Sequence, residues 1–354
     1  MTLLHNSRIG LTALIVAVLL TTAADAQQTE KPAKAAEGEY RVLKTFQVGG
    51  EGGWDYLTVD ADARRLYVSH ATRVEVLDAD TGKPVGEIPD TPGVHGIALA
   101  PDLGRGFISN GRAATATIFD LKSLKVIGTV PTGENPDAIV YEPTTKRVFT
   151  MNGRSNDATV IDAAAGKAVG KIEFGGKPEF AVADGTGKLF VNIEDKSQVL
   201  VLDPKELKVT ARWPVAPGEA PSGLAIDVKN HRLFSVCGNK KMVVLDAETG
   251  KVLATLPIGE RVDGAAFDPA TGLAYSSNGD GTLTIVHEEN PSTFAVIQNV
   301  TTQRGARTIA LDPKTHNVFL SSADFGPPPA SAPESGHARP SIVPGTFRIL
   351  VVGK

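Results

Sequence analysis

The sequence contains one cysteine, Cys237, so no disulfide can form within the chain. Aromatic residues make up only 6% of the chain and the formal net charge is −4. This composition disfavours a nucleic-acid-binding protein, because such surfaces are basic and offer aromatic rings for stacking. The motifs H-E-x-x-H, C-x-x-C and G-x-S-x-G and the phosphate-binding Gly-rich loop are also absent. The sequence therefore lacks the common signatures of zinc proteases, thiol oxidoreductases, serine hydrolases and nucleotide-binding enzymes.

Residues 1–26 are predicted to be a cleavable signal peptide. Arg8 supplies the positive start, Ile9–Leu20 the apolar segment, and Ala24-Asp25-Ala26 the small-residue site after which cleavage is expected. The apolar segment is shorter than the roughly 20 residues that span a membrane, so no integral span is expected after cleavage. A retained membrane anchor is the alternative. We predict a periplasmic or secreted protein in which the polar, aperiodic residues 27–39 form a flexible linker.

The remaining chain, 40–354, consists of repeats. Each repeat reads as four short strands joined by tight turns, which suits the 36 glycines and 23 prolines. The first strands of the repeats align as WDYLTVD (54–60), VHGIALA (94–100), PDAIVYE (136–142), PEFAVAD (178–184), PSGLAID (221–227), VDGAAFD (262–268) and ARTIALD (306–312). A period of roughly 40–45 residues with four strands per unit is typical of β-propellers. The predicted fold is an all-β, seven-bladed propeller with four antiparallel strands in each blade.

The last repeat ends one strand short. Its second strand is followed by a Pro/Gly-rich insert, 323–345, and then by a final strand within 347–352. The segment Tyr40–Val48 resembles the fourth strands of the other repeats. We therefore expect this N-terminal strand to pair with the C-terminal blade and close the ring, which removes exposed strand edges.

The amino-acid sequence of the repeats resembles that of a known family. VFTMN, LYVSH and LFVNI are second strands, VLD-x-x-TGK forms a turn, and a short strand ending in Pro-x-Gly follows. Together they resemble the YVTN-repeat (YncE-like) β-propellers over about residues 40–354. The resemblance implies a seven-bladed propeller that is commonly exported or surface-associated. Members of that family mostly lack an assigned reaction, and nucleic-acid binding has been proposed for some, so the resemblance leaves function open.

The second residue of each inner strand differs in chemistry from repeat to repeat. Equivalent positions recur every 40 to 44 residues and form one ring around the channel of a propeller. The candidate ligand-binding residues at this channel mouth are Asp55, His95, Asp137, Glu179, Asp263 and Arg307, with Ser222 in the fifth repeat. Like charges that face one another across a narrow channel need a cation, a proton or an arginine to balance them. A divalent cation is therefore a candidate cofactor. The alternative is a water-filled mouth whose polar residues only cap strands.

These observations give three hypotheses of function. The first is an exported, non-enzymatic propeller that binds a small molecule or a protein partner on the channel-mouth face. The second is a metal-dependent propeller enzyme of the lyase or lactonase type, in which a metal polarises the substrate and His95 or a carboxylate moves a proton. The third, single-stranded DNA binding, is disfavoured by the acidic ring. The insert 323–345 is expected to lie over the same mouth as a lid or partner-binding loop, with a functionless insert as the alternative.

Overall fold

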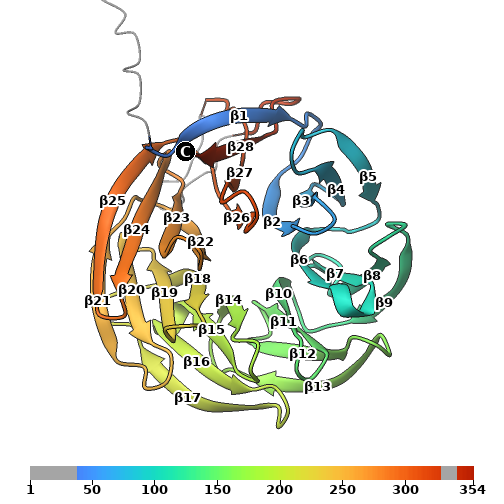
Figure 1. The fold of residues 1–354 in the computed structure, drawn as a ribbon. Coiled ribbons are helices and arrows are strands. Elements are labelled where there is room, and N and C mark those ends of the chain that lie inside the picture. Colours follow the sequence, from blue (N-terminus) through green and yellow to red (C-terminus); the bar gives the residue numbers. More distant parts are fainter. Residues whose placement is uncertain (1–37, 328–340) are drawn as a thin grey trace, which may run out of the picture. The chain divides into compact units, whose positions relative to one another are not determined.

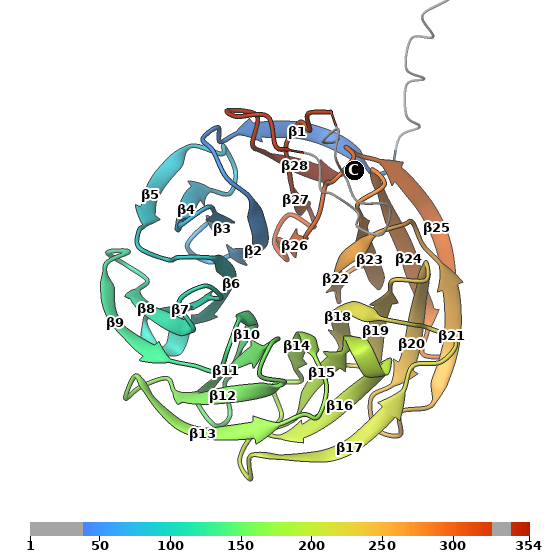
Figure 2. The ribbon, with the colours of Figure 1, turned by 180° about the vertical axis from the view of Figure 1, so that it is seen from behind.

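The computed structural model describes residues 38–327 and 341–354. The predicted signal peptide, the predicted linker up to residue 37 and the middle of the insert lie outside the described residues. Within the described ranges, seven four-stranded antiparallel sheets form the blades of a ring (Figures 1 and 2). This confirms the predicted seven-bladed propeller. None of the helices in these ranges has the length and apolar character that a membrane span requires.

Blades 1 to 6 each use four consecutive strands, ordered from the channel outward. Blades 1 and 2 are β2 (Trp54–Asp60), β3 (Arg65–His70), β4 (Arg73–Asp78), β5 (Pro84–Ile88), and β6 (Val94–Ala100), β7 (Arg105–Asn110), β8 (Thr115–Asp120), β9 (Val126–Pro131). Blades 3 and 4 are β10 (Pro136–Glu142), β11 (Arg147–Asn152), β12 (Asp157–Asp162), β13 (Lys167–Glu173), and β14 (Pro178–Ala183), β15 (Leu189–Ile193), β16 (Gln198–Asp203), β17 (Lys208–Pro214). Blades 5 and 6 are β18 (Pro221–Asp227), β19 (Arg232–Cys237), β20 (Lys241–Asp246), β21 (Val252–Pro257), and β22 (Val262–Asp268), β23 (Leu273–Asn278), β24 (Thr282–Asn290), β25 (Thr293–Thr301). Two single-turn 3-10 helices are η1 (Pro101–Leu103) and η2 (Glu194–Lys196).

Blade 7 contains both ends of the described chain. Its strands are β26 (Ala310–Leu311), β27 (Val318–Ser322), β28 (Arg348–Gly353) and, on the outside, β1 (Arg41–Gln47). β1 pairs antiparallel with β28, and Phe46 lies opposite Ile349. The predicted closure of the ring by the N-terminal strand is therefore confirmed.

The inner strand of blade 7 is shorter than predicted. The sequence predicts a strand over 306–312, but only Ala310–Leu311 joins the sheet. Arg307 keeps one backbone hydrogen bond, from its N–H to the carbonyl of Ser321 at 3.1 Å. Its own carbonyl instead accepts a hydrogen bond of 2.8 Å from the indole N–H of Trp54 in blade 1. Contacts with the neighbouring blade thus replace the ladder at the start of this strand.

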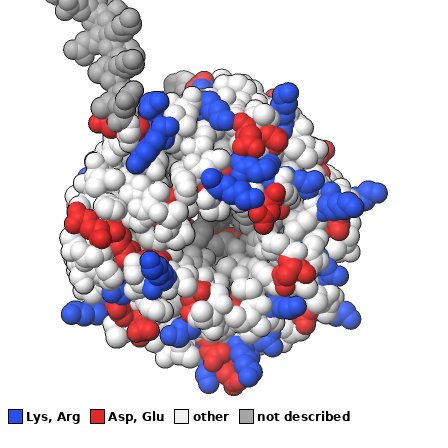
Figure 3. All heavy atoms as spheres, viewed as in Figure 1, with Lys and Arg blue, Asp and Glu red and all other residues white. Residues whose placement is uncertain are grey.

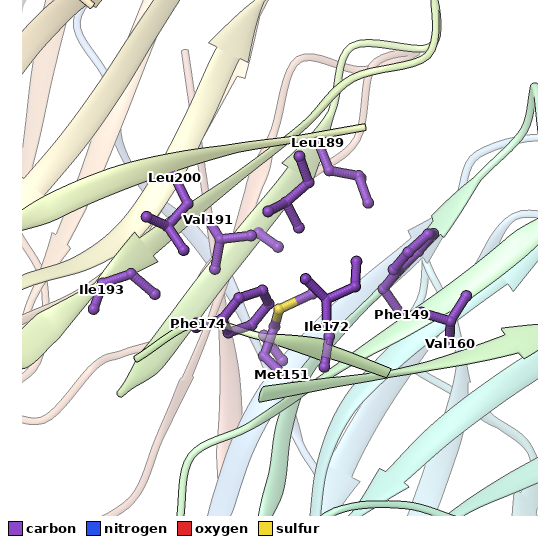
Figure 4. Packing of buried hydrophobic residues seen from close by; sticks show 13 residues of the cluster. Phe149, Met151, Val160, Ile172, Phe174, Leu189, Val191, Ile193 and Leu200 are labelled. Carbon is purple, nitrogen blue, oxygen red and sulfur yellow. The ribbon is translucent and has the colours of Figure 1, made fainter. Parts of the chain in front are cut away.

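Apolar side chains fill the space between neighbouring blades. Successive residues of a strand point to opposite faces of its sheet, so each blade presents an apolar face to either neighbour. Between blades 3 and 4, Phe149, Met151 and Ile172 pack against Val191 and Leu200 (Figure 4). All five side chains are at most 3% exposed. The ring is therefore held by a succession of such interfaces, with no central core.

A break in strand register recurs at the mouth end of the inner strands. In blade 1, Trp54 lies opposite His70 and the next pair is Leu57 with Val68, so two residues of β2 oppose one residue of β3. The same interruption follows the first residue of β6, β10, β14 and β18, and in β22 one extra residue, Asp263, lies between partners of the adjacent Asn278 and Ser277. Such β-bulges bend a strand and redirect its side chains. Each bulge contains the second residue of its strand, which is the predicted ring position.

Candidate functional site

Three of the predicted ring residues form a compact cluster. Asp55, His95 and Asp137 occupy neighbouring strands β2, β6 and β10. Nδ1 of His95 lies 2.5 Å from Oδ2 of Asp55 and 3.8 Å from Oδ1 of Asp137. One ligand atom from each residue lies within 4.8 Å of the other two. Their side chains are 18–26% exposed, so the cluster is largely buried but open to the mouth.

The other ring residues form two separate ion pairs. Nη1 of Arg307 lies 2.9 Å from Oδ2 of Asp263. Glu179 lies 3.1 Å from Nζ of Lys177, which also pairs with Glu194. The six candidates therefore share one mouth, but they divide into one three-residue cluster and two pairs that already have basic partners.

The carboxyl group of Asp137 has the most strongly shifted pKa of the cluster. Burial raises its pKa, the negative charge of Asp55 raises it further, and His95 lowers it, with a net value of about 8. For His95, burial lowers the pKa, but the hydrogen bond to Asp55 and the charge of Asp137 raise it by more. Both groups therefore retain a proton more strongly than usual. Near neutral pH these protons offset the negative charge that the two carboxylates would otherwise carry.

Two aromatic rings from different blades, Tyr56 and Phe180, are in contact next to this cluster. The third residue of the inner strands is small in most blades, because neighbouring blades approach closely: a Cβ at Gly223 would lie 2.5 Å from the backbone nitrogen of Ala265. Blades 1 and 4 instead carry Tyr56 and Phe180 at this position, and their ring centroids are 5.5 Å apart. Figure 2 shows β2 and β14 on opposite sides of the central channel, so the contact between these two rings spans it.

The far end of the channel is a different compartment. A cavity of about 590 Å³ lies there, and Phe180 contributes to its wall. Its other lining residues include the apolar Ile97, Leu99 and Val140.

The contact between Tyr56 and Phe180 and the partners of Glu179 were not predicted from the sequence. Tyr56 and Phe180 had a signal, because they are the two aromatic residues at the third position of otherwise similar strands. Lys177 precedes the first residue of its inner strand, and Arg261 occupies the equivalent position two blades later. A charged residue at this preceding position is the signal that could have found Lys177. Glu194 lies in η2, where no repeat pattern points to it.

Comparison with known proteins identifies the fold only. No family model matches the sequence, and no curated protein matches it. Hydrazine synthase from Kuenenia stuttgartiensis is 18% identical with a TM-score of 0.66, and the match covers 81% of this chain and 96% of that chain. The structure of U3-55K is 12% identical with a TM-score of 0.71, covering 89% and 98%. The WD40 repeats of RRP9 are 12% identical with a TM-score of 0.72, covering 90% and 98%. At such low identity the likeness establishes a β-propeller and carries no ligand or reaction with it.

Proposed function

We propose that this chain is a non-enzymatic binding propeller that holds a divalent cation at Asp55, His95 and Asp137. The ion would present its remaining coordination positions to an oxygen-bearing ligand at the channel mouth. The observation that carries this proposal is the convergence of two carboxylates and one imidazole within 4.8 Å. Carboxylate oxygens with an imidazole nitrogen suit Mn²⁺ or Zn²⁺ better than Mg²⁺, which prefers oxygen ligands and keeps its waters.

The charge balance of the mouth supports a cation. Asp137 lies beside Asp55, while the nearby basic groups Arg307 and Lys177 pair with other carboxylates. A bound cation would favour the ionised form of Asp137 by direct Coulomb attraction. The predicted signal peptide and the YVTN-repeat resemblance favour an exported protein that meets its ligand outside the cytoplasm.

Cation binding is expected to release protons and to strengthen as the pH rises. The raised pKa values of Asp137, about 8, and of His95 mean that both groups hold protons near neutral pH that a cation must displace. Each displaced proton increases the binding constant about tenfold per pH unit in the range where its group is protonated. Titration calorimetry with MnCl₂ from pH 6 to 9, in two buffers of different ionisation enthalpy, measures both quantities.

The same titration includes an outcome that contradicts the proposal. An affinity for Mn²⁺ that does not change from pH 6 to 9, with no proton release, would place the ion on exposed carboxylates whose pKa values are ordinary. If no heat of binding were measured at 1 mM MnCl₂, the proposal that the cluster binds a cation would be wrong.

A second candidate is a metal-dependent enzyme at the same mouth, of the lyase or lactonase type. One contact favours it: a carboxylate, Asp55, lies 2.5 Å from Nδ1 of His95, which is how a general base is oriented. In this case His95 would not ligate the cation, and it would take a proton from a substrate that the cation polarises. The Mn²⁺-loaded protein can be incubated with a panel of lactones and followed by NMR. Turnover that disappears in His95→Gln would replace the binding proposal with this one.

The distribution of charge gives no support to single-stranded DNA binding. On the face drawn in Figure 3, basic and acidic side chains alternate around the central hollow, with no continuous basic area. Binding to single strands requires a basic groove with exposed aromatic rings. The acidic cluster at the mouth would repel phosphate groups.

A further inference from the structure

A second cavity lies beside the mouth, where blades 6, 7 and 1 meet. Its volume is about 410 Å³, which is within the usual range for small-molecule sites. Three arginines contribute to its wall, Arg261, Arg304 and Arg307, and none of the described residues that line it is acidic. The acidic groups at Asp55, Asp137 and Glu179 do not line this cavity. It therefore has the opposite charge preference to the cation cluster.

One wall of this cavity is aromatic and rigidly placed. Trp54 stacks on Phe347 with a centroid distance of 5.3 Å and lies 6.1 Å from Phe325. The indole N–H of Trp54 is already used, because it donates to the carbonyl of Arg307. Phe325 packs over Gly305, where a Cβ would lie 2.4 Å from its ring. The wall thus presents flat apolar surface whose polar atom is already hydrogen-bonded.

Two of the arginines have donors available for a ligand. Arg304 is exposed and forms no hydrogen bond or ion pair with another residue in ranges 38–327 and 341–354. Arg261 is also exposed, and its guanidinium donates to the carbonyl of Gly279 at 3.0 Å. Arg307, the third, lies 2.9 Å from Asp263. Arg304 and Arg261 line the same cavity, and neither guanidinium group would have to leave an ion pair among the described residues to bind an anion.

Two acidic residues near this cavity have basic partners. Asp324 lies 2.6 Å from Nη2 of Arg348, and Glu260 lies 2.8 Å from Nζ of Lys240. Neither carboxylate lines the cavity. Because Arg348 and Lys240 pair with these two carboxylates, the carboxylates do not neutralise the arginines of the cavity wall. The positive charge of those arginines can therefore attract an external anion.

We propose that this cavity binds a small aromatic carboxylate, whose ring lies against Trp54 and Phe325 and whose carboxylate meets Arg304 and Arg261. Arginine pairs with planar carboxylates through two parallel N–H donors, which gives the contact its specificity. The aromatic wall explains why the ligand needs a flat apolar body in addition to its charge. This site uses residues other than the cation cluster and does not depend on it.

The probe for this proposal is 2-naphthoate, with the uncharged 2-naphthalenemethanol as its matched analogue. Both are titrated into the full chain in EDTA, so that cation binding cannot contribute, and are followed by calorimetry and by quenching of tryptophan fluorescence. We expect 2-naphthoate to bind at least about tenfold more tightly than the alcohol, as a charge-assisted arginine contact requires. Equal binding of the two compounds, or no binding of 2-naphthoate at 1 mM, would overturn the proposal.

Arginine variants locate the site. Arg304→Gln and Arg261→Gln remove exposed charges, and each is expected to weaken 2-naphthoate binding about tenfold. The control is Arg112→Gln, an exposed arginine of blade 2 that does not line the cavity. It is expected to bind like the unaltered protein. Unchanged affinity in both Arg304→Gln and Arg261→Gln, or an equal loss in Arg112→Gln, would show that the anion binds elsewhere.

Discussion

Replacing Asp137 with asparagine should abolish cation binding while stabilising the cation-free protein. The side chain keeps its shape but loses the charge that a cation requires, so we expect the affinity for Mn²⁺ to fall about 100-fold or more. In the cation-free protein the same charge is unfavourable, because it is buried beside Asp55. A gain in stability combined with a loss of binding is typical of a functional residue.

The stabilisation should depend on pH in a defined direction. The pKa of Asp137 is about 8 in the folded protein against an ordinary 3.8, so folding takes up a proton between these values and stability falls as the pH rises. The raised pKa of His95 acts in the same direction, since its contribution is lost as the pH rises through the folded-state value. We expect Asp137→Asn to melt higher than the unaltered protein at pH 9, by roughly 2–4 °C per 1 kcal/mol gained, and by less at pH 5.

Asp102→Asn is the control for this experiment. Asp102 lies in η1, its side chain is 45% exposed, and it accepts a hydrogen bond from Tyr141 outside the cluster. It should change neither Mn²⁺ affinity nor the pH dependence of melting. Thermal melts by circular dichroism at pH 5, 7 and 9, with calorimetry at pH 8, provide the comparison. An Asp137→Asn protein that binds Mn²⁺ normally, or that is less stable at pH 9, would contradict the cluster's role.

The second large effect should come from removing β1. A chain that starts at Val48 lacks Tyr40 and Phe46, which are 4% and 5% exposed, and leaves the edge of β28 unpaired. Truncating one buried aromatic side chain costs about 3–5 kcal/mol, and the total stability of a domain is about 5–15 kcal/mol. We therefore expect this shortened protein to be unfolded or aggregated at 25 °C, as judged by circular dichroism and size-exclusion chromatography.

A chain that starts at Glu39 is the matched control, because it keeps the whole of β1. It should melt within a few degrees of the full chain. If the chain starting at Val48 were instead monomeric, with an unchanged melting temperature, closure through β1 and β28 would not be what holds the ring together.

The fold could be predicted from the sequence because the same sequence pattern recurs in each blade. The alternation of apolar residues and the 40-to-44-residue spacing recur in seven copies, so an ambiguous stretch in one copy can be assigned by comparison with the others. The one error in the inner strands fell in blade 7, where Arg307 bonds to Trp54 in place of the ladder. That contact joins residues 253 positions apart, so a local sequence pattern cannot predict it.

The sequence predicts which residues lie at the channel mouth, but it does not predict which of them contact one another. Equivalent positions identify a ring, and the structure brings Asp55, His95 and Asp137 together. Which carboxylates remain without a basic partner depends on Lys177 and on the reach of Arg307, and these depend on side-chain geometry. The alignment of the repeats alone cannot distinguish a carboxylate that pairs with a basic residue from one that raises the pKa of a neighbouring carboxyl group.

The most direct measurement is anomalous diffraction from crystals grown with MnCl₂. The account predicts a peak at the channel mouth with Asp55, His95 and Asp137 as ligands, at distances of roughly 2.0–2.3 Å. It also predicts that this peak is absent in crystals of Asp137→Asn grown under the same conditions. A mouth without a peak in the unaltered protein, or Mn²⁺ bound only to carboxylates elsewhere, would contradict the central claim.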